Sequence, residues 1–111
     1  MRIALTLAAV ILTSSAAVAD AALAPSAIVA SPSTYDGKGV TVTGKVSNFQ
    51  TSQTMMGTVA GYQLCDTQCV VVIDQTNQAQ TDGSNATVTG TFHASFKTPK
   101  KTFTNAVVIA K

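Results

Sequence analysis

The stretch DGKGVTVTGKVSNF, residues Asp36–Phe49, combines a turn, an alternating strand and a glycine inside that strand. The same order returns 46 positions later in DGSNATVTG, residues Asp82–Gly90. In both copies Asp-Gly predicts a turn, because glycine adopts positive φ without steric cost, and the Val/Thr alternation predicts a strand with one buried face. A glycine within a strand marks a bulge or a sharp bend. Strands bent at Gly44 and Gly90 therefore predict a sheet that curls into a small barrel.

Hydrophobic alternation and turn residues along the whole chain predict five strands and one helix. The helix is expected within Ala24–Pro32, because Pro25 suits a first turn and Pro32 disfavours helix at the residue before it. Phe49 departs from the alternation of its strand, so either a bulge follows Val46 or the ring lies on the outer face. The expected strands are Val40–Phe49, Thr58–Cys65, Cys69–Asp74, Ala86–Lys97 and Thr102–Ala110, with Thr51–Gly57 as the first loop.

Two short connections fix the expected pairing of neighbouring strands. A three-residue hairpin loop at Asp66–Gln68 sets Leu64 opposite Val70, Tyr62 opposite Val72 and Cys65 opposite Cys69. A turn at Thr98–Lys101, with proline in its second position, sets Phe92 against Val107 and Phe96 against Phe103. The second hairpin predicts a buried aromatic cluster at one end of the core.

The N-terminal residues have the pattern of an export signal. Met1 and Arg2 give a positive start, Ile3–Leu12 is apolar, and Ala17–Ala19 is a small-residue cleavage site. We expect residues 1–19 to be a cleaved signal peptide and residues 20–111 to form a single domain. The apolar run is too short for a transmembrane helix, which needs about 20 such residues.

The predicted elements and three sequence motifs together resemble small exported bacterial OB-fold proteins. The motifs are YDGKGVTVTGKV (Tyr35–Val46), YQLCD (Tyr62–Asp66) and VTG (Val88–Gly90). The resemblance implies an all-β fold, a five-stranded OB-fold Greek-key barrel with a short N-terminal helix. It also implies a ligand face on the second and third strands, between the first and last hairpin loops, where such barrels bind oligonucleotides and oligosaccharides. On this chain that face maps to Met55, Met56, Tyr62, Pro99 and Lys100.

A second resemblance concerns metal binding. The periplasmic copper and silver chaperone of metal efflux systems is a small OB barrel that uses two methionines, a histidine and a tryptophan. Met55, Met56 and His93 are similar to part of that set, and soft Cu(I) and Ag(I) accept thioether and imidazole ligands. The chain has no tryptophan and its two methionines are adjacent, which counts against the site. Methionine also serves as flexible packing under a loop.

The two cysteines, Cys65 and Cys69, lie on either side of the predicted hairpin loop. An oxidising compartment and opposed strand positions favour a structural disulfide. A redox role is weaker, because the Cys-x-x-Cys spacing is absent and no helix is predicted nearby to lower a thiol pKa. A zinc site is weaker still, since two thiolates and one distant histidine, His93, leave the tetrahedral ligand set incomplete.

Three lysines, Lys97, Lys100 and Lys101, gather around the last predicted turn. Six lysines against five aspartates remain after export, so the chain has no strong basic footprint for nucleic acid. The lysines are therefore either a solvated turn or a contact for an anionic partner such as a single-stranded nucleic acid. In the second case Phe49 and Tyr62 are the candidate stacking rings.

The sequence contains no recognisable set of nucleophile, base and orienting group, so we do not expect an enzyme. His93 is expected on the outer face of its strand, and the aspartates sit mainly at turns. We expect an exported, monomeric binding or interaction module of the periplasm or cell envelope, or a secreted one, without a cofactor. Its partner on the barrel face would be an oligonucleotide, an oligosaccharide or a protein. Polyanion binding through the last turn and Cu(I) or Ag(I) binding are the alternatives.

Overall fold

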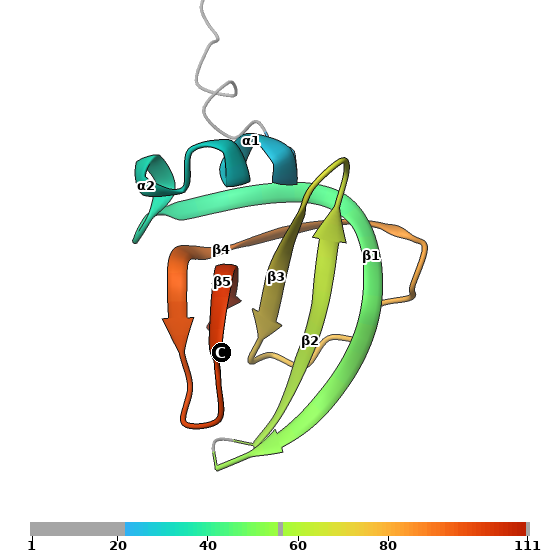
Figure 1. The fold of residues 1–111 in the computed structure, drawn as a ribbon. Helices are drawn as coiled ribbons and strands as arrows, with labels where there is room; N and C mark the ends of the chain where they lie inside the picture. The colour runs from blue at the N-terminus through green and yellow to red at the C-terminus, as the bar shows by residue number, and fades with distance from the viewer. Residues whose placement is uncertain (1–21, 56, 111) are drawn as a thin grey trace, which may run out of the picture.

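The computed structural model describes residues 22–55 and 57–110, which form two short helices and five strands (Figure 1). The proposed signal peptide and Met56 lie outside these residues. The elements are α1 (Pro25–Ala30), α2 (Pro32–Tyr35), β1 (Gly39–Thr54), β2 (Gly57–Cys65), β3 (Cys69–Asp74), β4 (Asn85–Lys97) and β5 (Thr102–Ile109). The strands follow one another in the order β1-β2-β3-β5-β4, and β4 pairs with β1 to close the ring. All neighbours are antiparallel except β3 and β5, so the sheet is mixed.

The core fills the inside of this ring. Val40, Val42 and Val46 of β1 are buried, which confirms the predicted inner face of that strand. Phe92 of β4 is fully buried opposite Val107 of β5, as its predicted register requires. Leu64, Val70 and Val72 are also among the largest fully buried side chains.

Helix α1 closes one end of the ring with a fully buried isoleucine, Ile28. The helix is held in place by Asp66, which follows β2. Ser26 donates to this carboxylate from its backbone nitrogen (3.0 Å) and from its hydroxyl (2.6 Å), and Gln68 N donates to it from the other side (3.1 Å). These hydrogen bonds lower the pKa of Asp66, because they stabilise the ionised carboxylate.

The internal repeat is also a structural repeat. Val42 pairs with Val88, its own equivalent 46 positions later, so β1 and β4 meet around a local pseudo-twofold axis. Gly37 N donates to Phe92 O (2.7 Å), and the equivalent Gly83 N donates to Val46 O (2.8 Å). Gly37 and Gly83 both have positive φ, as the Asp-Gly turns predict.

Gly44 and Gly90 lie at the bends of β1 and β4, next to the residue at which each strand begins to pair with a second neighbour. Strand β1 pairs with β4 up to Lys45, the residue at which its pairing with β2 begins. Strand β4 pairs with β1 up to Thr91, the residue at which its pairing with β5 begins. A Cβ at Gly90 would stand 2.5 Å from Val108 O of β5. The glycines are therefore needed because a third strand approaches the backbone closely at the bend.

The five predicted strands and the pairings Leu64–Val70, Tyr62–Val72 and Phe96–Phe103 are confirmed. The loop predicted for Thr51–Gly57 is wrong, because β1 continues to Thr54 in register with β2. The single helix is wrong as well, since Pro32 begins a second helix. The aromatic cluster is only partly buried, because Phe96 and Phe103 remain partly exposed while Phe92 is inside.

The bulge alternative for Phe49 is the observed one. The register of β1 shifts between Ser47 and Gln50, and Asn48 has a φ of 56°. The extra residue turns the Phe49 ring toward the core, where it stacks on Tyr62 with 5.8 Å between ring centroids.

Candidate functional site

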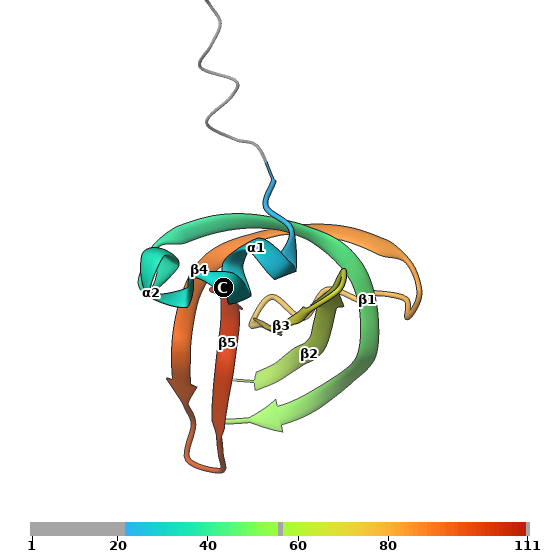
Figure 2. The ribbon, with the colours of Figure 1, turned by 45° about the horizontal axis from the view of Figure 1, so that its top comes forward.

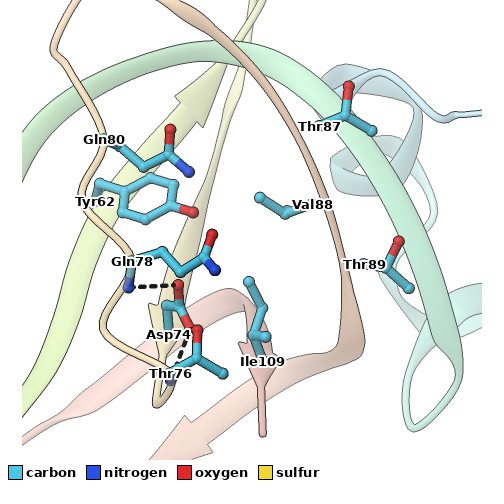
Figure 3. A pocket seen from close by; sticks show the side chains of 9 residues that line it. All are labelled: Tyr62, Asp74, Thr76, Gln78, Gln80, Thr87, Val88, Thr89 and Ile109. Atoms are coloured by element: carbon cyan, nitrogen blue, oxygen red, sulfur yellow. Dashed lines mark hydrogen bonds between the residues drawn. The ribbon is translucent and has the colours of Figure 1, made fainter. Parts of the chain in front are cut away.

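A polar hollow lies where β3 and β5 finish (Figure 3). The helix α1 lies near the other end of β3 (Figure 1). The volume of the hollow is about 290 Å³. Asp74 and Ile109 are the last residues of two neighbouring strands. The loop that follows β3 and the first half of β4 supply most of the remaining wall. The lining residues are Tyr62, Asp74, Thr76, Gln78, Gln80, Thr87, Val88, Thr89 and Ile109.

Asp74 organises the loop that forms this wall. Its Oδ1 accepts hydrogen bonds from Thr76 N (2.8 Å) and Thr76 Oγ1 (2.5 Å), and its Oδ2 accepts a longer one from Gln78 N (3.4 Å). Gln75 N donates to Ile109 O (2.9 Å), which ties the start of the loop to β5. An aspartate that binds backbone N–H groups two and four residues later stabilises a turn, so the sequence folds locally around this side chain.

Tyr62 reaches the hollow from β2. The residue is only 3 % exposed, and its hydroxyl is buried without a hydrogen-bond partner among the described residues. Figure 3 shows the hydroxyl directed across the hollow toward Val88, with the side chains of Gln80 and Gln78 on either side. The aromatic ring of Tyr62 is held in place by its stack with the Phe49 ring.

Burial raises the pKa of the Tyr62 hydroxyl, and the negative charge of Asp74 raises it further. A contact with the Gln80 side chain, whose geometry falls short of a full hydrogen bond, lowers it in part. The hydroxyl therefore stays protonated at neutral pH and can both donate and accept a hydrogen bond. With the glutamine amides and the Thr76 hydroxyl beside it, the hollow can orient a small ligand through several hydrogen bonds. Buried polar groups that converge in a hollow are the usual means by which a site fixes the orientation of a ligand.

Of the residues predicted to bind a ligand, the structure brings Phe49 and Tyr62 together but leaves the lysines elsewhere. Lys97, Lys100 and Lys101 are exposed around the β4–β5 turn, at the opposite end of β5 from Ile109. The turn is closed by the Thr98 side chain, which accepts from Lys101 N (3.1 Å) and donates to Lys101 O (2.8 Å). Lys101 Nζ also lies 4.8 Å from the centroid of the Phe103 ring.

The cysteines and the proposed metal ligands are placed as follows. Cys65 and Cys69 form a disulfide across the β2–β3 hairpin. Met55 is fully exposed at the β1–β2 turn, and the His93 ring packs against Phe96 with 5.3 Å between centroids. Because Met56 is outside the described residues, the copper hypothesis stays a prediction.

Of the residues that line the hollow, the sequence predicts only Tyr62 as a ligand contact. It predicts Asp74 as a strand end and the segment from Gln75 to Asp82 as a loop without an apolar pattern. The available signal was Asp74 followed two residues later by Thr76, which is typical of a side-chain-stabilised turn, and the alternating glutamines Gln78 and Gln80 after it.

Comparison with protein-family models, curated proteins and solved structures finds no match to this chain. Within residues 22–55 and 57–110, neither helix has the length and hydrophobicity needed to cross a bilayer.

Proposed function

We propose that this protein is an exported, non-catalytic OB-fold module of the periplasm or cell envelope that binds a small polar ligand in the hollow beside Tyr62. The closed order of the five strands and the helix at one end of the ring support the OB-fold assignment. The Cys65–Cys69 disulfide supports an oxidising compartment, in agreement with the export signal in the sequence.

The observation that carries the proposal is the unpaired Tyr62 hydroxyl. Leaving a buried hydroxyl without a partner costs about 1 to 3 kcal/mol, and native proteins do so rarely. Here Tyr62 lines a hollow together with other polar groups, and the Gln80 side chain beside its hydroxyl would move aside when a ligand binds. A ligand that hydrogen-bonds to the hydroxyl would recover this free energy on binding.

The chemistry of the lining favours binding over catalysis. The hollow presents amides, hydroxyls and one carboxylate, and these described residues include no cysteine, histidine or lysine. A nucleophile activated by a neighbouring base is therefore not assembled there.

The test is an NMR screen of the oxidised mature chain against small polar compounds. A ligand of the hollow should shift the side-chain amide signals of Gln78 and Gln80 and the methyl signals of Val88 and Ile109. The Tyr62→Phe variant should bind that ligand with lower affinity, whereas Tyr35→Phe, on α2, should bind it with unchanged affinity. Ligands that shift only the signals of the β4–β5 turn would refute the proposal.

A second candidate function, polyanion binding, rests on the three exposed lysines of the β4–β5 turn. This turn and the β1–β2 turn both lie on the side of the ring away from the helices (Figures 1 and 2). Phe49 and Tyr62 stack on each other and Tyr62 is buried, so the lysines would contact phosphates rather than support bases stacked on these rings. Fluorescence anisotropy with short single strands should show salt-sensitive binding that is lost when Lys97, Lys100 and Lys101 are all changed to Ala. Equal binding by both proteins would exclude this candidate.

A further inference from the structure

We infer that the ligand of the hollow carries a primary ammonium group, which Asp74 and Tyr62 bind together. This inference rests on the proposed function and specifies the chemical class of its ligand.

Asp74 is a buried carboxylate without a cationic partner among the residues that line the hollow. The side chain is 2 % exposed, and its three hydrogen bonds come from uncharged donors, Thr76 N, Thr76 Oγ1 and Gln78 N. Buried carboxylates are usually paired with a cation, because uncharged donors compensate only part of the lost hydration. The wall of the hollow therefore carries a negative charge that no lysine of the described lining residues balances.

The polar groups of the hollow include several hydrogen-bond acceptors, which favour a ligand with several donors. The ionised carboxylate of Asp74 only accepts hydrogen bonds, and its Oδ2 is engaged only by the long bond from Gln78 N. The unpaired Tyr62 oxygen, the Gln78 and Gln80 amide oxygens and the Thr76 hydroxyl are further acceptors. A primary ammonium has three donors and no acceptor, so it complements this set better than an alcohol or a carboxylate does.

The lining of the hollow suits an organic cation better than a metal ion. Calcium takes six to eight oxygen ligands and usually several carboxylates, whereas the lining of the hollow offers only Asp74. Among the described residues no cluster of three His, Cys, Asp or Glu side chains is suited to a metal ion. A hollow of about 290 Å³ has room for an ammonium group with a short carbon chain.

The experiment compares four probes of similar size on the oxidised mature chain by NMR titration. The probes are n-butylammonium chloride, tetramethylammonium chloride, n-butanol and sodium butyrate. We expect n-butylammonium to shift the Gln78, Gln80 and Ile109 side-chain signals, and to bind at least tenfold more tightly than the other three. Tetramethylammonium carries the same charge but has no N–H donor, so it separates hydrogen bonding from charge alone.

Two isosteric variants provide the controls. Asp74→Asn should lower the affinity for n-butylammonium at least tenfold, whereas Asp36→Asn, which removes the same charge from an exposed turn, should not. Shifted amide signals of Thr76 and Gln78 would show that Asp74→Asn disturbs the loop. In that case Tyr62→Phe serves as the test variant, and its affinity for n-butylammonium should be at least threefold lower than that of the wild type.

The outcomes separate the inference from the proposed function. Tighter binding of n-butanol or butyrate in the hollow would overturn the ammonium inference and leave the binding site standing. If the wider screen finds ligands for the hollow and n-butylammonium does not bind, the inference is likewise overturned. If no compound shifts the residues of the hollow, both the inference and the proposed function fail.

Discussion

Asp66 and Asp74 show how the same side chain serves two purposes in this protein. Asp66 is exposed and accepts three hydrogen bonds at the end of the ring that α1 closes. Asp74 is buried at the other end, where it shapes a loop and leaves a negative charge inside a hollow. The first carboxylate stabilises the fold, and the second shapes the loop of the candidate site.

Tyr62→Phe should stabilise the ligand-free protein by about 1 kcal/mol, because it removes a buried hydroxyl without a partner and keeps the ring that stacks on Phe49. Urea unfolding of the oxidised protein measures the change, with Tyr35→Phe as the control that should leave the free energy of unfolding nearly unchanged. A loss of more than about 1 kcal/mol in Tyr62→Phe would mean that the hydroxyl already has a partner in the free protein.

Asp66→Asn should destabilise the protein at pH 7 but not at pH 2. The pKa of Asp66 is lower in the folded state than its usual value of about 3.9, so its contribution to stability is present above that value and is lost as the pH falls through the folded pKa. Urea unfolding from pH 7 to pH 2 should therefore show the two proteins converge in acid. An equal difference at both ends of this range would contradict the assignment.

The donor from Ser26 can be tested separately. Its hydroxyl hydrogen bond is the largest cause of the lowered pKa, so Ser26→Ala should move the pKa of Asp66 back toward its usual value. NMR titration of the Asp66 side chain measures this pKa directly. An unchanged pKa in Ser26→Ala would assign the shift to the backbone donors instead.

Among the secondary-structure elements, β1 and β4 act as one repeated unit. Across their shared edge the Thr41 and Thr89 hydroxyls are 2.9 Å apart, and the equivalent pair Thr43 and Thr87 is 2.7 Å apart. The symmetry ends at the bulge around Asn48, which adds one residue to β1 and not to β4. That single residue makes the stack of Phe49 on Tyr62 possible and so fixes one wall of the candidate site.

Gly44 and Gly90, the glycines at the strand bends, should differ in how much an alanine substitution destabilises the protein. Gly90→Ala should cost roughly 2 to 3 kcal/mol, because its Cβ would stand 2.5 Å from Val108 O, and Gly44→Ala should cost less, because its nearest neighbours are 3.1 Å away. Gly39→Ala is the matched control, since no atom lies within 4 Å of its Cβ. Thermal unfolding should rank the variants in this order, and a Gly39 variant as unstable as Gly90→Ala would contradict it.

The elements were largely predictable from the sequence, whereas of the candidate site only Tyr62 was predicted. Strand periodicity and the Asp66–Gln68 loop were sufficient to place Tyr62 opposite Val72 in the correct register. The extension of β1 to Thr54 was missed because Thr, Ser and Gln outside the core carry no apolar period. The hollow was missed because Asp74 and Gln80 are brought to Tyr62 only by ring closure, a tertiary event without a local pattern.

At the scale of the whole molecule, the ring joins segments that are distant in the sequence. Its closing pairs are β1 with β4 and β3 with β5, and the second of these is parallel. The buried side chains of all five strands meet in one core, with Ile28 of α1 at one end and the hollow at the other. Stability therefore comes from the shared core and the continuous ladder, and the single disulfide reinforces one hairpin of it.

Reduction of the Cys65–Cys69 disulfide should leave the ring folded and lower the free energy of unfolding by at most about 2 kcal/mol. The disulfide closes a loop of only a few residues, so it removes little conformational entropy from the unfolded chain. The hairpin also keeps its strand pairing and the hydrogen bond from Asp66 N to Gln68 O (2.9 Å). Urea unfolding with and without reductant measures the loss, and the Cys65→Ser, Cys69→Ser double variant provides a control that cannot reoxidise. Amide signals should change near the hairpin and remain constant around the hollow, because the two lie at opposite ends of β3. An unfolded reduced protein at 25 °C would show instead that the ring depends on this bond.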